Sequence, residues 1–583
     1  MRHLGSFRMY ESVIRELAGR GHDVHIVVDR GERLGWRKGL EQLLADCPTV
    51  RWSWSLRQRR RLFWFEFSRV VRIWLDYLRY FEPRYDTTPI LRRRAADLMP
   101  PVFVRVTDRW PLSTGWGRGL LRRALRLAER SLPRVGGIDD GLRSEMPDVM
   151  LITPLIYLGS PQVEMLRSAR GLGIRTALCV GSWDHLSSKA VIRDRPQRIF
   201  VWNETQKSEA VDLHGVPAEQ VVVTGAQCYD QWFGRGPSRD VAQFCRDVGL
   251  RPDRPFLLYV CSALFWGSPV EAEFVTEWVE SLRSSGVPAL RDIGILIRPH
   301  PARAREWDTI DLKRFDNVTL YGSNPIDHDS RNDYFDSLYY STAVIGLNTS
   351  AFLEAAIVGR PVHTILPPKF HDNQEGTLHF RYLRTVGGGV LRAARDFDAH
   401  RTQLLESIAH GADNRAFVQA FVRPNGLDRP ATAAFVDAVE QLGREPRPAP
   451  AAEPLWILAL RPLFYPLALL AQLVFAGRGE ASDKTSREIA REKAQERRRQ
   501  QREQFVTRRE QLRQRQKSAV VQARAAARAR KEQARERRIA QAETAARERQ
   551  RERERAIAAK QRRRRREALG QWIRHKLGLA SRA

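Results

Sequence analysis

A histidine held between two prolines is the first feature of this chain that could do chemistry. The stretch ILIRPHP, residues 295–301, places three apolar residues before Arg298, and His300 follows between Pro299 and Pro301. The apolar residues predict the end of a buried strand, and the prolines restrict the loop in which His300 stands. An imidazole and a guanidinium at a strand end can bind a phosphate or move a proton. The same pattern also fits a histidine that only closes a turn.

A second group of polar residues follows another predicted strand. The run AVIGL, residues 343–347, ends in Asn348, Thr349 and Ser350, which open a predicted helix. These three residues can cap that helix, but free backbone N–H groups at its start also attract anions. Glu354 lies one turn after Ser350 on the same helical face, where it suits hydroxyls such as those of a ribose. Together with the histidine loop, this group suits a nucleotide monophosphate or diphosphate.

Short apolar runs that end in polar loops recur along the chain and predict the sheets that position these residues. We expect strands in 24–28, 149–158, 174–182, 198–204, 220–227, 256–262, 294–300, 318–322 and 343–350, separated by helical segments. This rhythm predicts an α/β protein with two facing Rossmann-like domains, 1–235 and 241–442. Ligands in such sheets bind at the carboxyl ends of the strands, where Ser262 is expected to join the donor site.

The beginning of the chain reads as a helix over 12–18, a glycine turn and a strand over 24–28. A unit of this kind normally follows another strand, for which the first residues leave no room. Either the start of the chain was assigned too late, which we favour, or the sheet begins one strand short.

Composition limits the environment and the partners. The 583 residues carry a formal net charge of +30, and from Glu480 onward 34 Lys/Arg stand against 14 Asp/Glu, about +20 of that total. Such a balance implies an anionic partner. The five cysteines show no paired spacing, which indicates a reducing compartment without a disulfide framework. No apolar run follows Met1, so we expect a cytoplasmic protein.

Residues 51–81 form an insertion rich in tryptophan, phenylalanine and arginine within the first half. One interpretation is a core helix flanked by solvated arginines. The other is an amphipathic surface for a lipid-linked acceptor or a membrane interface.

A proline-rich linker, 443–454, ends the globular part and leads into the apolar segment 455–476. This segment is long enough to span a bilayer but contains Arg461, Pro462, Pro466 and Gln472. A span would place the basic tail opposite the catalytic domains, against the positive-inside tendency. We therefore favour a re-entrant or in-plane segment broken at the prolines, at the inner face of the cell membrane; a true span and a soluble core helix are the alternatives.

Residues 480–570 are rich in Arg, Gln, Glu and Ala, with Glu–Arg pairs three residues apart such as Glu496/Arg499. Apolar residues are too sparse for heptads, so we expect a long single basic helix rather than a coiled coil. Beside an apolar segment such a helix could hold anionic lipid. Nucleic acid is not excluded as a partner, although no recognition motif accompanies the charge. A solvated, partly disordered tail is the plainest alternative.

Four further residues are candidates for the site. Asp184 follows a predicted strand of the first half and is a candidate base, although it can equally cap the next segment. His3, in the first loop, is a candidate on the acceptor side. Lys369 and His371, in PPKFHDNQEG, are candidates for binding donor phosphates or the sugar. No acidic cluster has a convincing position for a metal, and we expect neither a metal nor a cofactor.

The order Arg298-Pro299-His300-Pro301, then Asn348-Thr349-Ser350 with Glu354 and Gly359-Arg360-Pro361, resembles the HP and Ser/Thr motifs of bacterial GT-B transferases. That group includes sialyl- and Kdo-transferases and CDP-glycerol glycerophosphotransferases, which make capsule, lipopolysaccharide or teichoic acid polymers. Residues 181–233 are similar to the inter-domain stretch of the same group, and the likeness covers residues 1 to about 440. The resemblance implies that His300, Thr349 and Ser350 bind the donor nucleotide and its phosphate.

The function expected from the sequence is a GT-B glycosyl- or glycerophosphotransferase of surface polysaccharide assembly. Its donor would be a nucleotide-activated sugar or glycerol, and its acceptor a lipid-linked or polymeric one. An enzyme similar to UDP-N-acetylglucosamine 2-epimerases, which need no acceptor, is the first alternative. A non-catalytic scaffold that binds polyanions or membranes is the second.

Overall fold

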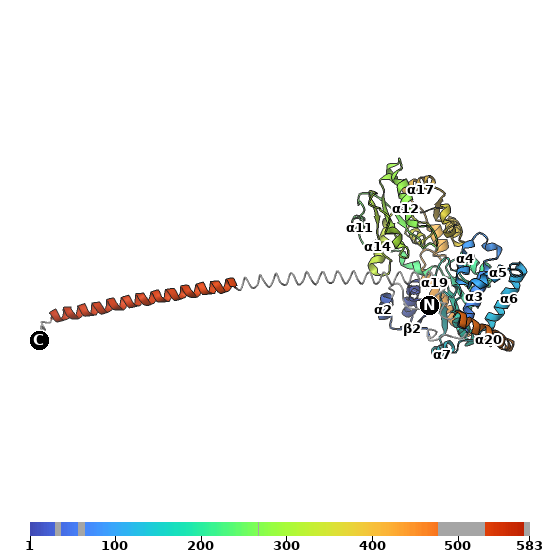
Figure 1. Cartoon of the computed structure of the whole chain (residues 1–583), viewed down its shortest axis with the longest axis horizontal. Helices are drawn as coiled ribbons and strands as arrows, with labels where there is room; N and C mark the ends of the chain where they lie inside the picture. Colours follow the sequence, from blue (N-terminus) through green and yellow to red (C-terminus); the bar gives the residue numbers. More distant parts are fainter. Residues whose placement is uncertain (30–36, 56–63, 266, 476–530, 577–583) are drawn as a thin grey trace. The chain divides into compact units, whose positions relative to one another are not determined.

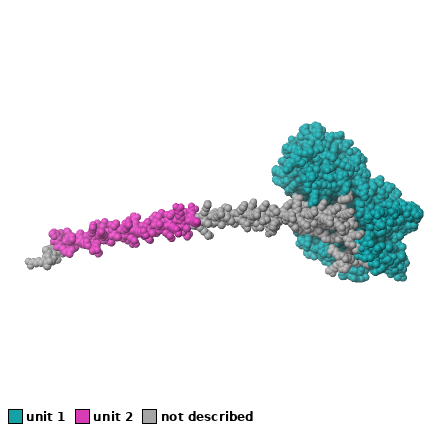
Figure 2. Space-filling view, in the orientation of Figure 1, with its two compact units in different colours: residues 1–482 teal, residues 483–583 magenta. Residues whose placement is uncertain are grey.

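The computed structural model describes residues 1–29, 37–55, 64–265, 267–475 and 531–576 (Figure 1). The chain divides into two compact units, Met1–Ser482 and Asp483–Ala583 (Figure 2). All the strands of the described residues lie in the first unit and pair in parallel. The expected α/β class with two Rossmann-like domains is therefore confirmed.

The N-terminal domain contains two parallel sheets. β1 (Val24–Val28) pairs with β2 (Val50–Trp54), and a second sheet has the order β3 (Val149–Ile152), β4 (Arg175–Cys179), β5 (Arg198–Val201), β6 (Val221–Val223). Its helices are η1 (Leu4–Met9), α1 (Glu11–Gly19), α2 (Arg37–Asp46), α7 (Gly136–Glu145), α8 (Val163–Gly171), α9 (His185–Ser188), α10 (Glu204–His214), η4 (Ala218–Gln220) and η5 (Gln227–Trp232). Five of the expected strands are present here: β1 has the expected bounds, and the other four are shorter than their apolar runs.

The first residues lie beside β1, where the sequence called for a preceding strand. The amino group of Met1 donates to the carbonyl of Val27 at 2.6 Å, and the N–H of Asp29 donates to the carbonyl of Met1 at 3.0 Å. These bonds satisfy backbone groups of β1 that would otherwise be an unpaired sheet edge.

The insertion after β2 is helical, and its first helix is mostly buried. It contains α3 (Phe65–Arg79), η3 (Pro83–Tyr85), α4 (Pro89–Leu98), α5 (Pro101–Thr107) and α6 (Gly115–Ser131). α3 is a core helix, in agreement with the first interpretation of 51–81. The core helix does not extend over the whole of 51–81, because residues 51–54 complete β2; residues 56–63 lie outside the described part.

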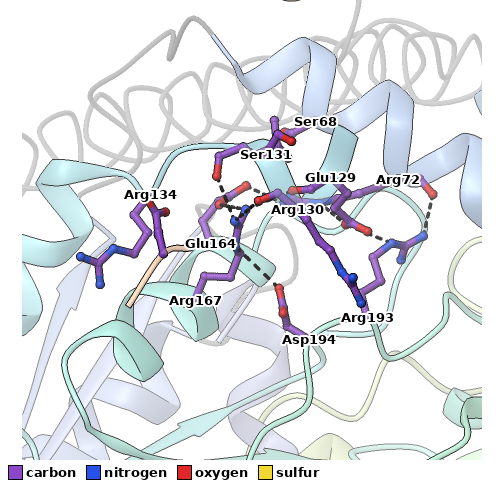
Figure 3. A network of polar contacts seen from close by, with 12 residues as sticks. Ser68, Arg72, Glu129, Arg130, Ser131, Arg134, Glu164, Arg167, Arg193 and Asp194 are labelled. Carbon is purple, nitrogen blue, oxygen red and sulfur yellow. Dashed lines mark hydrogen bonds and ion pairs between the residues drawn. The ribbon is translucent and has the colours of Figure 1, made fainter. Parts of the chain in front are cut away.

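A buried ionic network attaches α3 to the domain (Figure 3). The guanidinium of Arg72 is fully buried and donates to Glu129 of α6 at 3.0 Å and to Glu164 of α8 at 2.6 Å. Arg193 contacts Glu129 at 3.3 Å and Asp76 of α3 at 2.5 Å. These charges compensate one another in a buried region, so the network depends on every member.

The C-terminal domain is built on a six-stranded parallel sheet with the order β12-β11-β10-β7-β8-β9. The strands are β7 (Phe256–Val260), β8 (Gly294–Arg298), β9 (Val318–Leu320), β10 (Ala343–Ile345), β11 (Val362–Ile365) and β12 (Leu391–Ala394). The helices are α11 (Val241–Val248), α12 (Glu271–Arg283), α13 (Pro288–Arg291), η6 (Ala304–Trp307), α14 (His328–Tyr340), α15 (Ala351–Ile357), η7 (Pro368–Asn373), η8 (His379–Arg381), α16 (Tyr382–Thr385), η9 (Val386–Gly388), α17 (Phe397–His410) and α18 (Arg415–Phe421). β11 and β12 were not expected, because their short runs lack a distinct pattern.

The last helix of the predicted C-terminal domain packs in the N-terminal domain. α19 (Ala431–Arg444) places Phe435, Val436 and Leu442 in the same hydrophobic cluster as Val13 of α1 and Ile26 of β1. The boundary at 442 was therefore wrong, because the apolar face of α19 is needed to cover the N-terminal core. The N-terminal domain consists of two separate stretches of chain.

The apolar segment forms α20 (Leu455–Phe475), one helix without a break. The expected interruption at Pro462 and Pro466 is wrong: both rings lie on the exposed side, so the stripe that faces the protein continues past them. By length and mean hydropathy, 1.7, this is the one helix of the described residues that could cross a membrane.

In the second unit, residues 531–576 form a helix whose side chains are almost all exposed. This agrees with the single basic helix expected there. The expected helix over 480–530 lies outside the described residues.

Two buried histidines predict how stability depends on pH. Among the residues that the structure describes, neither ring nitrogen of His400 in α17 has a hydrogen-bond partner, and burial lowers the pKa of His400 to about 3. Burial also lowers the pKa of its neighbour His363 well below the usual value. The unfolded chain takes up these protons near pH 6.5, whereas the folded protein does not, so stability is complete above that pH and falls as the pH decreases toward 3. At pH 5 we expect a loss of about 2 kcal/mol for His400 alone.

The measurement is the difference in unfolding free energy between wild type and His400→Leu at several pH values. That difference should shift in favour of the variant between pH 7 and pH 5. His410→Leu, at the exposed end of the same helix, should show no such shift. Parallel curves for all three proteins would contradict the assignment.

Candidate functional site

The strand order brings the predicted donor residues together at the carboxyl ends of the strands of the C-terminal sheet. β7 begins the sheet, β8 and β9 follow on one side, and the chain then returns to add β10 on the other side of β7. The carboxyl ends of β7 and β10 thus lie at the point where the order reverses, the usual place of ligands in such sheets. Ser262 follows β7, His300 follows β8 and Asn348 follows β10.

Hydrogen bonds join the loops across this reversal point. The N–H of Asn348 donates to Oγ of Ser262 at 3.0 Å, and the N–H of Ser262 donates to Glu271 of α12 at 2.8 Å. The amide of Asn348 donates to the carbonyl of Asn373, whose own side chain accepts from the N–H of Phe265 at 2.8 Å. Ser262 is fully buried, so it positions Asn348. Asn373 was missed by sequence reasoning, because a polar residue in an irregular loop gives no periodic signal.

His300 is half-buried immediately after β8. Its Nδ1 accepts the N–H of Ala302 at 3.2 Å, which leaves the proton of the neutral ring on Nε2. Burial, and then the charge of Arg303, lower the pKa of His300 below its ordinary value. At neutral pH the ring is therefore a neutral donor through Nε2–H.

The guanidinium of Arg298, for which the sequence suggested a phosphate contact, is engaged with neighbouring protein groups. It is buried, donates to the carbonyls of Asp333 and Ser323 at 3.4 Å and lies 5.2 Å from the ring centre of Tyr334. A side chain at Gly322 would collide with its guanidinium. These contacts give Arg298 a role in holding β8 against α14.

Thr349 and Ser350 differ in their availability. Oγ1 of Thr349 accepts the N–H of Ala351 at 3.3 Å, as a capping hydroxyl does. Ser350 precedes α15, is exposed and makes no side-chain capping bond. Its hydroxyl is accordingly the freer of the two for a ligand.

Glu354 lies where α15 meets the N-terminal domain. Its carboxylate accepts the hydroxyl of Tyr334, and burial raises its pKa to about 7, with Arg8 of η1 acting in the opposite direction. Burial raises the pKa of Tyr229 in η5, and the charge of Glu354 adds to that rise. Glu354 thus borders the boundary between the domains, and its hydrogen bond to Tyr334 competes with the expected contact to a ribose.

Lys369 and His371 follow β11, and both were expected to bind donor phosphates or the sugar. Their side chains have other neighbours in the structure. Nζ of Lys369 pairs with Glu277 of α12 at 3.1 Å. His371 is exposed, 3.8 Å from Asp372, which also approaches Arg93 of α4 at 3.7 Å. The structure does not bring either side chain into the network of Ser262 and Asn348.

On the N-terminal side, Asp184 is held by several donors. It accepts from Ser182 at 2.6 Å and Ser188 at 3.1 Å and pairs with Lys189 at 2.9 Å. Despite burial, Lys189, His379 and His185 hold the pKa of Asp184 well below its usual value. Asp184 therefore stays ionised at neutral pH and by itself is a weak proton acceptor.

His379 of η8 is a site residue that the sequence did not suggest. Its ring lies 4.7 Å from that of Trp183, which places the histidine against the loop of Asp184 from the other domain. Burial lowers the pKa of His379 to about 4, and its Nδ1 has no partner in the described structure. The pair combines a neutral imidazole with a carboxylate. The surrounding segment GTLHFRY gave no strand or motif signal that could have revealed it.

The remaining predictions concern His3 and a metal. His3 is exposed at the start of η1, the helix whose last turn carries Arg8. Within the part of the chain that the structure describes, no three His, Cys, Asp or Glu residues are grouped so that they could hold a metal ion. Metal-independent chemistry stays a prediction.

No protein-family profile and no curated protein matches this sequence. Among solved structures, the chain is similar to a UDP-GlcNAc 2-epimerase from Neisseria meningitidis bound to UDP-GlcNAc, at 12% identity over 76% of this chain and 100% of that one, with a TM-score of 0.44. A putative UDP-N-acetylglucosamine 2-epimerase from Listeria monocytogenes is 14% identical over 76% of this chain and 96% of that one, with a TM-score of 0.43. The calicheamicin glycosyltransferase CalG4 is 13% identical over 74% of this chain and 94% of that one, with a TM-score of 0.37. Likeness at this level does not bear on activity, which has to be argued from the site.

Proposed function

We propose that this chain is a glycosyltransferase or glycerophosphotransferase that uses a nucleotide-activated sugar or glycerol donor in cell-surface polysaccharide synthesis. The observation that carries the proposal is that Asn348, Ser262 and His300 follow the neighbouring strands β10, β7 and β8 at the reversal point of the C-terminal sheet, where the N–H of Asn348 donates to Ser262. The acceptor, lipid-linked or polymeric, would approach from the N-terminal domain.

The donor phosphate is assigned to His300 and Ser350. Nε2–H of His300 donates to a phosphate oxygen, and Ser350 adds a hydroxyl after β10. Thr349 and Asn348 shape the loop through their backbone contacts. Donors fixed before reaction stabilise the charge that develops on a departing phosphate without reorganising at that moment.

The base that deprotonates the acceptor hydroxyl is assigned to His379 with Asp184. The charge of Asp184 favours the imidazolium of His379, but burial keeps the pKa of that histidine at about 4. His379 therefore takes the proton late in the transfer, when bond formation has made the acceptor hydroxyl acidic. Glu354, with a pKa of about 7, lies at the same domain boundary and contributes charge there.

The test is a thermal-shift panel of the full chain with CMP, CDP, UMP, UDP and GDP. A ligand that binds only the folded state stabilises it by about 2.7 kcal/mol at a hundredfold excess over Kd. We expect one base to be preferred and the shift to disappear in His300→Ala. Nucleotides of equal phosphate number carry equal charge, so the basic tail cannot produce a preference for one base.

His328→Ala is the matched control, because His328 is exposed at the start of α14. It should keep the full shift. If no nucleotide shifts the thermal midpoint of a folded wild type, the assignment of a donor site is wrong. Conversion of UDP-N-acetylglucosamine without an acceptor would favour the epimerase.

A further inference from the structure

α20 is mostly apolar and packs only one of its sides against the protein. Ile457, Ala468 and Ala471 are buried, and Phe464 packs on Phe67 of α3 with ring centres 6.1 Å apart. The same stripe carries Arg461, which donates to the carbonyl of Ser131 in α6 and pairs with Glu453. The helix therefore lies along α3 and α6, and leaving them would uncover their shared core.

The opposite side of α20 is apolar and exposed. Leu455, Leu463, Leu467, Leu470 and Leu473 are between 50% and 83% exposed. A surface helix of a soluble protein normally carries polar residues on its exposed side. A contiguous apolar surface there marks an interaction site.

Neighbouring elements continue this apolar surface. Phe103 of α5 lies 6.3 Å from Phe475 of α20, ring centre to ring centre. The exposed side chains of α5, of the loop after it and of α6 include Val102 (51%), Val106 (39%), Trp110 (79%), Trp116 (59%) and Leu120 (52%). In Figure 1, α3, α5, α6 and α20 lie together on the side of the first unit away from α11 and α12. We call the exposed residues of α5, α6 and α20 the apolar face.

Arginines accompany the apolar face. α6 has five arginines against one glutamate, and Arg105 and Arg109 lie beside Trp110. Within the described residues, Arg105, Arg109 and Arg123 make no ion pair. The positive charge is concentrated enough that Arg122 and Arg130 add to burial in lowering the pKa of Arg126.

We propose that the apolar face binds the surface of an anionic lipid bilayer, with α20 lying in the plane of the interface. Exposed tryptophans beside arginines suit the boundary between headgroups and acyl chains, and basic residues near it are attracted to anionic lipid. A second copy of the chain fits poorly, since its arginines would meet the same arginines. The proposal does not rest on the enzyme activity.

The experiment is flotation of the full chain with vesicles of phosphatidylcholine, alone or mixed with phosphatidylglycerol. Leu470→Gln/Leu473→Gln and Trp110→Ala/Trp116→Ala change exposed side chains without changing charge. We expect each pair to weaken binding to the mixed vesicles about tenfold or more, because less apolar surface enters the interface. Val241→Gln, an exposed apolar residue of α11, should bind like wild type.

The basic tail is intact in every variant, so its contribution cancels. Equal binding of all variants would assign the binding to the tail alone and overturn the proposal, as would a wild type that does not float. A wild-type dimer, measured by sedimentation, that Leu470→Gln/Leu473→Gln dissociates would make a second copy the occupant and overturn it as well. Unchanged thermal midpoints of the variants establish that they fold.

Discussion

Replacing Arg72 with alanine is expected to lower the free energy of unfolding of the first unit by about 3–5 kcal/mol. The substitution removes the fully buried guanidinium that Glu129 and Glu164 share and leaves two largely buried carboxylates without that partner. It also uncouples α3 from α6 and α8, because Arg72 of α3 contacts Glu129 of α6 and Glu164 of α8 (Figure 3). Denaturant unfolding followed by circular dichroism measures the loss.

A matched pair of controls separates burial from charge. Arg251→Ala breaks an ion pair with Asp316 in which both side chains are more than half exposed, and it should cost less than about 1 kcal/mol. Arg72→Met with Glu164→Gln removes a charge of each sign and should recover part of the loss. If Arg72→Ala and Arg251→Ala are equally stable, the network does not support the insertion.

The second large effect is expected at Asp230 of η5, where the two domains are joined. One carboxylate oxygen accepts from Arg423 at 2.7 Å and from the N–H of Ala431, and the other accepts from the N–H of Thr432 at 2.7 Å. Asp230→Ala leaves Arg423 without its partner and the start of α19 without its acceptor. We expect a loss of about 3–5 kcal/mol, because both partners are largely buried.

Limited proteolysis gives a second readout for Asp230→Ala, since a loosened α19 becomes accessible within 431–444. Asp437→Ala lies on the same helix but pairs with Arg20 and Arg429 at the surface. It should change stability by less than about 1 kcal/mol and leave the cleavage pattern unchanged. A cleavage pattern of Asp230→Ala identical to that of wild type would contradict the assignment.

Strands with long apolar runs could be predicted from the sequence, because burial on both faces of a parallel sheet leaves a continuous signal. β7 and β8 are of this kind and were found at nearly their true bounds. β2 was hidden in an aromatic stretch, and its pairing with β1 depends on contacts distant in sequence. Likewise, α19 has a clear apolar face, but sequence alone does not tell which core that face covers.

The candidate site was predictable in residue type and only partly in geometry. His300 and Ser350 have side chains available for a ligand, whereas Arg298 and Lys369 satisfy neighbours that no local pattern predicts. A long cationic side chain can turn toward a carbonyl or a carboxylate several ångströms away, so its strand position does not fix its direction. The position of His379 beside Trp183 results from packing between segments distant in sequence, so no local pattern could predict it.

The placement of α19 has a consequence for how the chain matures on the ribosome. The core around α1 and β1 lacks Phe435, Val436 and Leu442 until residue 444 has left the exit tunnel. The C-terminal sheet, whose strands all lie between residues 256 and 394, can form before that point. The domain that is synthesised first is therefore completed last, and a fragment that ends near residue 235 would expose the apolar surface that α19 covers.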